Sequence, residues 1–425
     1  MKRQGALIER LSWATGLTTF ADGYNLTVVP ACLPILLRQF HLSGLAGTEL
    51  AAGTLFGSLI GGMVGGWLVD RWGRQLIFRY DLWLFAALAL LSALAPSFVL
   101  LLATRILLGV AIGADYVISP TYLAEFAPSR QRGRDLSFVW LMWPLGAALS
   151  DFIAALLLPA APPATGWRVL LALAAIPALM GLILRRGIPE SPRWLLGVAG
   201  DHQSGHALIR RYDLEPVELQ PARKLAASAF ARWMTAVGPW ICLTMASYGI
   251  GMILPTVLSR SGLVDLKAAD WITGVVTVGG VPGALIAMLW LDRLGRRSLQ
   301  TAGFLAASFL LWGLAEALNL HISVFLATLV LLTAAQIVSN AGPGTISGIY
   351  PAELFPTHRR GTATGISTAL SRLGAVAATF LFAAVSKGHG LTGVAGIAGG
   401  IMLAGGLLTW LFGPETAGRT LEELS

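Results

Sequence analysis

Apolar stretches of about 20 residues recur along the whole chain, separated by short polar segments. A helix of about 20 residues crosses the roughly 30 Å hydrocarbon core of a bilayer. No water satisfies backbone groups there, so such stretches must be helical. The pattern therefore predicts an all-α membrane protein with twelve transmembrane helices. These are expected at residues 13–37, 46–69, 76–95, 98–126, 136–159, 167–185, 235–259, 269–291, 298–317, 322–350, 361–384 and 391–413.

One stretch, at residues 186–234, is far more polar than its surroundings and contains histidine, arginine and acidic side chains. Its composition predicts a cytoplasmic linker with short surface helices. The chain then divides into an N-terminal six-helix bundle at 1–185, this linker, and a C-terminal six-helix bundle at 235–425.

Three pairs of short segments echo one another at nearly the same separation along the chain. They are GGWLVDRWGRQ at 65–75 with LWLDRLGRRS at 289–298, AEFAPSRQRGR at 124–134 with AELFPTHRRG at 352–361, and PESPRW at 189–194 with PETAGR at 414–419. Such repeats indicate two related halves. Transporters built from related halves hold their substrate between them, near the middle of the membrane.

Glycines predict where helices approach closely or break. Gly57 and Gly61 lie four residues apart in the second predicted helix, and Gly109 and Gly113 do so in the fourth. Small residues at this spacing let helix backbones come close together. The Gly-Pro-Gly sequence at 342–344 predicts a loosened tenth helix.

Composition supports a membrane protein, and the charge distribution predicts its orientation. Only 12% of the residues are charged, whereas soluble proteins have about 25%. The net charge of +8 could suggest a nucleic-acid partner, but the arginines gather in the loops after the even-numbered helices. Because cytoplasmic loops are rich in arginine and lysine, both termini are expected in the cytoplasm, in a cell (inner) membrane, with no nucleic-acid partner. Those arginines are Arg71, Arg74, Arg79, Arg130, Arg132, Arg134, Arg293, Arg296, Arg297, Arg359 and Arg360.

The Asp-Arg-x-Gly-Arg loops, PESPRWL after the sixth helix and PETAGRTLEE after the twelfth resemble the sugar porter branch of the major facilitator superfamily. The segment RILLGVAIGADYVISPTYLAEF at 105–126 is more similar to neighbouring proton symporters of phosphate and organic metabolites. Together these features favour a monomeric, proton-coupled importer of a small polar metabolite, sugar-like or an organic acid, working by alternating access. An exporter of a small organic compound and a non-transporting nutrient sensor on the same fold remain alternatives.

Three ionisable residues inside predicted helices are candidates for proton coupling: Asp22, Arg105 and Asp115. Charged groups within a membrane are costly and usually functional. The resemblance implies that a helix-one aspartate pairs with Arg105. The family's aspartate position is Asn25 here, which cannot titrate, so Asp22 or Asp115 must carry the proton, or the protein is a uniporter. A static buried ion pair is the structural alternative.

The candidate substrate lining combines aromatic and polar side chains. Aromatic faces suit sugar rings or aromatic acids, while amides and hydroxyls form directed hydrogen bonds. Packing, or a place in the aromatic belt at the membrane surface, is the alternative role. The candidates are Tyr24, Asn25, Tyr116, Trp140, Trp143, Trp240, Thr244, Tyr248, Gln336 and Asn340.

The charged repeats at the helix ends predict a cytoplasmic gate. Opposite charges there could hold the two halves together in one state and separate in the other, although topology and solvation alone could also explain them. The candidates are Asp70, Arg71, Arg74, Glu125, Arg132 and Glu190, with Asp292, Arg293, Arg296, Glu353, Arg360 and Glu415 as counterparts. The sequence has no pattern typical of a metal site, a cofactor site or an enzyme nucleophile.

Overall fold

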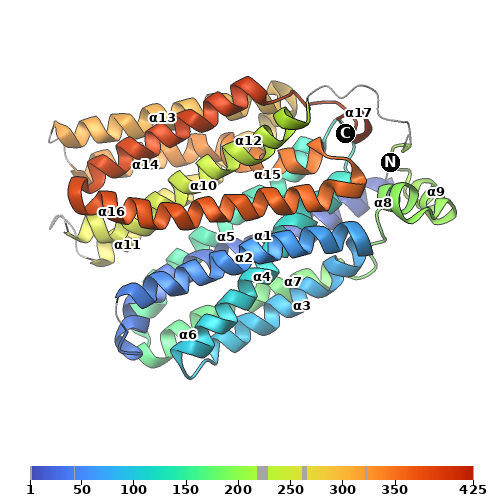
Figure 1. Ribbon diagram of the computed structural model, residues 1–425. Coiled ribbons are helices and arrows are strands. Elements are labelled where there is room, and N and C mark those ends of the chain that lie inside the picture. Colours follow the sequence, from blue (N-terminus) through green and yellow to red (C-terminus); the bar gives the residue numbers. More distant parts are fainter. Residues whose placement is uncertain (1, 43, 218–227, 261–265, 321–323, 425) are drawn as a thin grey trace.

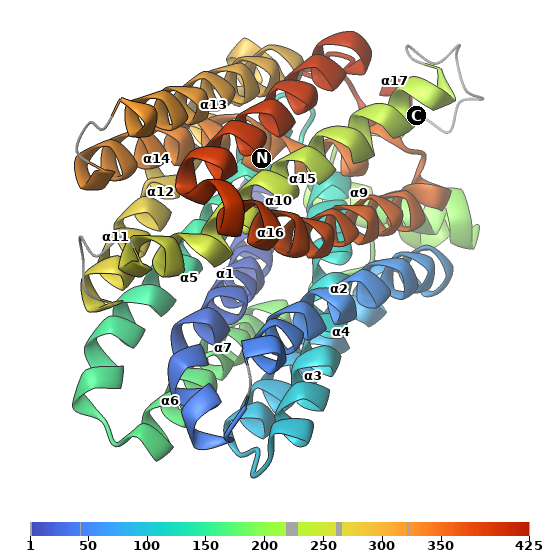
Figure 2. The same cartoon turned by 60° about the vertical axis from the view of Figure 1, so that its left-hand side comes forward.

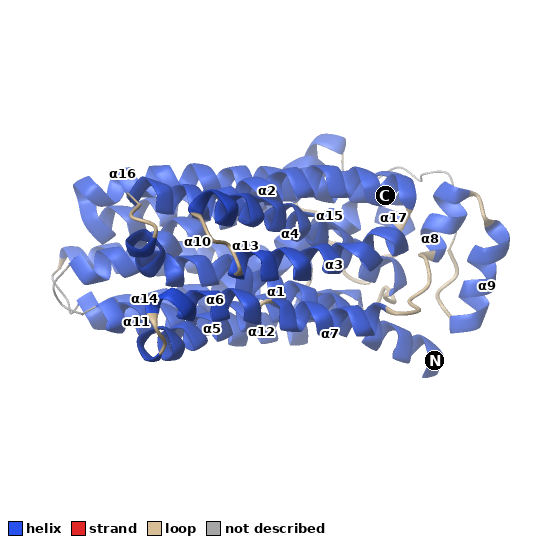
Figure 3. Ribbon diagram, turned by 90° about the horizontal axis from the view of Figure 1, so that it is seen from below, coloured by secondary structure: helices blue, strands red, loops and turns tan. Residues whose placement is uncertain are grey.

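The computed structural model describes residues 2–42, 44–217, 228–260, 266–320 and 324–424. Within those ranges every regular element is a helix and no strand occurs (Figure 3), which confirms the all-α prediction. The first half contains α1 (Lys2–Gln39), α2 (Gly44–Trp72), α3 (Arg74–Ala93), α4 (Phe98–Phe126), α5 (Arg132–Ala160), α6 (Pro163–Leu173) and α7 (Ala175–Arg185). The second half contains α10 (Ala229–Arg260), α11 (Leu266–Val278), α12 (Gly280–Leu294), α13 (Arg296–Asn319), α14 (Val324–Ala341), α15 (Pro343–Leu354) and α16 (Thr357–Phe412). Four short helical elements lie outside these sets: α8 (Pro192–Trp194), the π-helix η1 (Leu195–Ala199), α9 (His202–Tyr212) and α17 (Leu421–Leu424).

Among the described residues, ten helical segments are long and apolar enough to cross a membrane. One of them, α16, contains two predicted spans joined at Gly390, where φ is 58° and ψ is −151°. Glycine adopts this conformation readily because it lacks a Cβ atom. With α10, which contains the predicted span 235–259, these segments account for the twelve predicted helices.

The helix bounds differ from the sequence prediction mainly at the start and at internal breaks. Helix α1 begins at Lys2 rather than near residue 13, because Leu7 and Leu11 are buried and extend its packed face. The tenth predicted span divides into α14 and α15 at Gly342, just before Pro343. Proline lacks an N–H and cannot continue the hydrogen-bond ladder, so the predicted break is confirmed.

The two halves lie on opposite sides of the molecule, with α2 and α16 side by side where they meet (Figures 1 and 2). Helix α5 also packs on α11 and α12 across the same boundary. The chain ends, α8, α9 and α17 all lie at one end of the helices (Figures 1 and 3). We call this end the gate end, because the charged repeats gather there.

Glycines permit the closest helix contacts, as the sequence predicts. A Cβ atom on Gly61 would lie 2.0 Å from the carbonyl oxygen of Val110, and one on Gly113 would lie 2.1 Å from that of Ser58. The same device operates between the halves, where a Cβ on Gly365 of α16 would lie 2.2 Å from a carbonyl oxygen of α2. Larger side chains would force these backbones apart.

Candidate transport site and gate

Arg185, the last residue of α7, joins four helices of the first half through buried contacts. Its Nη2 donates to Asp115 of α4 at 2.9 Å and to the Thr18 hydroxyl of α1 at 2.7 Å, and its Nη1 donates to Asp81 of α3. All three charged side chains are less than 10% exposed. The candidates for proton coupling predicted from the sequence included Asp115 but neither Arg185 nor Asp81. Asp81 carried a usable signal, since it is a carboxylate inside a predicted membrane span.

Asp22 lies in α1, is 1% exposed, and has no hydrogen-bond partner among the described residues. It interacts electrostatically with Asp115, Asp81, Arg185 and Arg372. The carboxylates outnumber the arginines in this group. A proton on Asp22 would therefore remove a buried charge that no direct partner neutralises.

Arg105 binds Asn25, and the expected pair of Arg105 with Asp22 does not form. Its Nη1 donates to the Asn25 side-chain oxygen at 3.0 Å and its Nη2 donates to the Asn25 backbone oxygen at 2.6 Å. Asn25 lies almost one helical turn beyond Asp22 on α1. That offset places the amide, rather than the carboxylate, opposite the guanidinium.

An aromatic and cationic cluster lies where the two halves meet. The ring centroid of Tyr116 (α4) is 5.5 Å from that of Trp140 (α5), which is 6.1 Å from that of Trp240 (α10). From α16, the Arg372 guanidinium lies 4.3 Å from the Tyr116 ring centroid and donates to the Tyr248 hydroxyl at 3.1 Å. These five residues form what we call the central cluster. Four were predicted as substrate contacts, and Arg372 was missed although it lies within the predicted span 361–384.

Other predicted lining residues lie outside this cluster. The Tyr24 hydroxyl donates to the Leu170 carbonyl at 3.1 Å, so it packs α1 on α6. The Thr244 hydroxyl donates to the Ser371 carbonyl at 2.8 Å, and Asn340 donates to the Gln336 carbonyl at 3.0 Å.

Two lining candidates remain to be placed. Gln336 lines a cavity of about 90 Å³ that lies wholly among α10, α11, α13, α14 and α16. Trp143 is half-buried, and its indole N–H has no partner in the described part of the chain.

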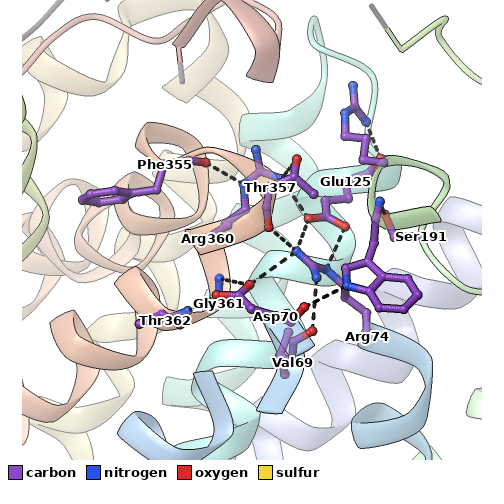
Figure 4. Close-up of polar contacts among 12 residues, drawn as sticks. Val69, Asp70, Arg74, Glu125, Ser191, Phe355, Thr357, Arg360, Gly361 and Thr362 are labelled. Atoms are coloured by element: carbon purple, nitrogen blue, oxygen red, sulfur yellow. Dashed lines mark hydrogen bonds and ion pairs between the residues drawn. The ribbon is translucent and has the colours of Figure 1, made fainter. Parts of the chain in front are cut away.

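At the gate end, Glu125 of the first half binds arginines from both halves (Figure 4). It accepts from Arg74 of its own half at 2.9 Å and from Arg360 of the second half at 2.8 Å. Asp70 accepts the backbone N–H groups of Gly361 and Thr362, at 2.9 and 2.7 Å, near the start of α16. Helix N-termini favour such negative charges.

The second repeat builds the same arrangement with the halves exchanged. Glu353 accepts from Arg132 of the first half at 2.8 Å and lies 3.3 Å from Arg296 of its own half. Asp292 accepts the backbone N–H groups of Gly133 and Arg134, at 3.1 and 2.8 Å, in the first turn of α5. The gate end is therefore closed by two equivalent sets of contacts, which we call the two clamps.

Glu190 and Glu415 support the clamps from within each half. Glu190 accepts the backbone N–H groups of Arg74 and Gln75, both at 3.0 Å. Glu415 accepts those of Arg296 and Arg297, at 2.9 and 3.2 Å. Burial raises the pKa of the Glu190 carboxyl above its usual value, although these hydrogen bonds oppose the rise.

Two predicted gate residues do not take part in the clamps. Arg71 and Arg293 are exposed, and neither forms an ion pair within the described ranges. Arg71 instead stacks over Trp67, with 5.3 Å between the guanidinium and the ring centroid. Adjacent helix positions do not face each other, so Arg71 points away from Asp70.

A further contact at the gate end was not predicted. Arg193 of α8 donates to Glu422 of α17 at 2.8 Å. Burial would raise the pKa of the Glu422 carboxyl, but Arg193 and the local hydrogen bonds hold that pKa below its ordinary value.

The membrane-spanning helices form two sets that are clamped together at one end. Buried charged and aromatic side chains lie where the two sets meet. This arrangement is typical of a secondary transporter. The chain matches the model of the sugar (and other) transporter family over residues 14–425, and it belongs to that family. It is an integral, multi-pass membrane transporter rather than an enzyme.

Two curated relatives come from Escherichia coli (strain K12). The metabolite transport protein YaaU is 33% identical over 98% of this chain and 94% of its own, and the inner membrane metabolite transport protein YgcS is 32% identical over 96% and 91%. Among solved structures, the proton:xylose symporter XylE, in complex with 6-bromo-6-deoxy-D-glucose, is 23% identical over 99% of both chains, with a TM-score of 0.81. This likeness confirms the twelve-helix fold.

Proposed function

We propose that this protein imports a small polar metabolite together with protons, by alternating access of residues 1–185 and 235–425 around a site at the central cluster. Residues 186–234 serve as the linker between the moving halves. The protein works as a monomer in the inner membrane, with both termini and the gate end in the cytoplasm. The arginine-rich loops after the even-numbered helices support this orientation.

One observation carries the proposal: Asp22 is buried without a hydrogen-bond partner within the described ranges, beside two further carboxylates. Burying an unpaired charge costs several kcal/mol, on the order of 3–5 where a partner is lost. Taking up a proton removes that cost, so the protonated carrier closes around its substrate more easily than the ionised one. Asn25 cannot perform this role, because its amide does not titrate.

XylE is described as a proton:xylose symporter, which supports proton coupling in this fold. YaaU and YgcS are named only as metabolite transport proteins, so they leave the choice between a sugar and an organic acid open.

Two transport measurements on reconstituted vesicles test the coupling. Asp22→Asn should abolish accumulation driven by a pH gradient while keeping exchange of internal for external substrate. Exchange needs the site and the conformational change, whereas accumulation also needs the proton. Glu316→Gln, which changes an exposed carboxylate on α13, is the matched control and should retain both. Equal loss of exchange and accumulation in Asp22→Asn would refute the coupling role.

A further inference from the structure

Arg372 is the buried arginine of the central cluster, and its hydrogen-bonding capacity is largely unused. Its side chain is 2% exposed, and its Nη1 donates to the Tyr248 hydroxyl. Its Nε and Nη2 groups have no hydrogen-bond partner in the part of the chain that the structure describes. Guanidinium groups stay protonated and can only donate, so these N–H groups need acceptors.

Each of the other fully buried arginines donates to at least two oxygen atoms of the protein. Arg74 and Arg360 share Glu125, and Arg132 and Arg296 share Glu353. Arg105 holds two oxygens of a single asparagine. Within the described ranges, Arg372 lies within ion-pair distance of no carboxylate, and its hydrogen-bonding partners are the phenol groups of Tyr248 and Tyr116.

The groups around Arg372 add donors and aromatic faces. The indole N–H group of Trp140 also lacks a partner among the described residues. Tryptophan, like arginine, can only donate. The Trp140 ring rests on Gly348 of α15, where a Cβ atom would lie 1.9 Å from the ring, so glycine is needed to admit it. The cluster therefore combines unused donors, a positive charge and aromatic rings at the boundary between the halves.

We propose that Arg372 binds the carboxylate of a ring-bearing organic acid, which would be the transported substrate. An ionised carboxylate is an acceptor-only anion, and guanidinium–carboxylate hydrogen bonds are roughly twice as strong as neutral ones. A neutral sugar has no charge to offset the buried guanidinium. The rings of Tyr116, Trp140 and Trp240 supply flat apolar surfaces for the body of the acid. This inference rests on the proposed transport function and narrows its substrate class.

Asp22 links this anion site to the proton. Its charge acts on Arg372, so an ionised Asp22 and a substrate carboxylate compete for the same positive charge. A proton on Asp22 ends that competition and strengthens binding of the acid. One monovalent anion and one proton then enter together with no net charge movement, whereas a neutral sugar with a proton would carry current.

Binding to the purified full-length protein in detergent, followed by tryptophan fluorescence, tests the inference. The probes are two pairs that differ mainly in the carboxylate: D-glucuronate with D-glucose, and benzoate with benzamide. We expect at least one acid to bind and its neutral partner to bind at least tenfold more weakly. Arg372→Gln should weaken binding of that acid by at least about 30-fold, and Arg372→Lys should restore part of it. Arg71→Gln, which removes an exposed arginine, is the matched control and should bind as the wild type does.

Tyr248→Phe keeps the ring but removes the hydroxyl that holds Arg372, and should weaken binding of the acid about threefold to tenfold. This milder variant tests the inference even if Arg372→Gln does not fold. Equal binding of acids and neutral partners, binding by neither acid, or an Arg372→Gln variant that folds and binds the acid normally would overturn it. Proton-driven uptake of D-glucose that persists in Arg372→Gln would overturn the anion site while leaving the proposed transport function intact.

Discussion

The clamp at Asp70 offers the sharpest test of the gate, because its contacts cross between the halves. Asp70 is 8% exposed and accepts two backbone N–H groups of α16. Asp70→Asn keeps one oxygen acceptor and replaces the other with an amide that can only donate. One N–H of α16 then loses its acceptor, and the other exchanges a charged acceptor for a neutral one.

The cost falls mainly on the closed gate. A hydrogen bond to a charged group contributes about 1.5–3 kcal/mol, and a buried N–H left unpaired costs about 1–3 kcal/mol. In the open gate, water takes the place of these N–H groups as the hydrogen-bond partner of residue 70. The substitution then changes the free energy of the open state little. We therefore expect a net shift of about 2 kcal/mol toward the open gate. That corresponds to a change of roughly 30-fold in the ratio of closed to open molecules.

Pulsed electron resonance between two spin labels measures this shift. Labels at Arg71→Cys and Arg359→Cys lie on exposed positions of the two halves at the gate end. Cys32 and Cys242 would first be replaced by serine. Asp70→Asn should move the population from the shorter to the longer distance.

Asp292→Asn, in the equivalent clamp, should shift the population in the same direction but less, because its side chain is 22% exposed. Glu9→Gln changes an exposed carboxylate and should have no effect. Unchanged distances in both aspartate variants would refute the gate, and the loop charges would then serve topology and solvation alone.

Three further substitutions have defined outcomes. Gly365→Val places a side chain where even a Cβ would lie 2.2 Å from a carbonyl oxygen of α2, so the halves should fail to close at the gate end and transport should be lost without loss of membrane insertion. Asn25→Asp gives Arg105 a titratable partner, so the pH profile of the initial uptake rate should gain a titration step beyond the one due to Asp22. Glu422→Gln removes the ion-pair partner of Arg193 and should lower stability by at most about 1 kcal/mol at pH 7. Because folding lowers the pKa of Glu422, its contribution is complete above the ordinary value of 4.5 and disappears as the pH falls through the lower folded value, so thermal unfolding of variant and wild type should converge in acid.

The hydropathy pattern and the internal repeats were enough to predict the helices and most of the gate residues. Span length alone located the helices, since a bilayer requires about 20 apolar residues in each. The repeats identified Glu125 and Glu353 as equivalent, and both hold arginines from the two halves. Arg71 and Arg293 were predicted in the gate but lie outside the clamps, because neighbouring positions on a helix point in different directions.

The central site was harder to predict because its contacts depend on helix rotation. A shift of one turn along α1 decides whether Arg105 contacts Asp22 or Asn25. The spacing of residues in the sequence does not determine which faces of two helices pack together. Arg185 stands at the end of a span, where arginine also serves topology. Arg372 did have a readable signal, as a permanent charge inside an apolar stretch.

The most direct test of proton coupling is to measure the proton movement that accompanies solute entry. Vesicles containing the protein and a trapped pH-sensitive dye would receive, from outside, whichever of D-glucuronate or D-glucose binds. We expect the interior to acidify as the solute enters, and Asp22→Asn vesicles to show no solute-dependent acidification. Solute entry at the wild-type rate with no change of internal pH would contradict proton coupling and identify a uniporter.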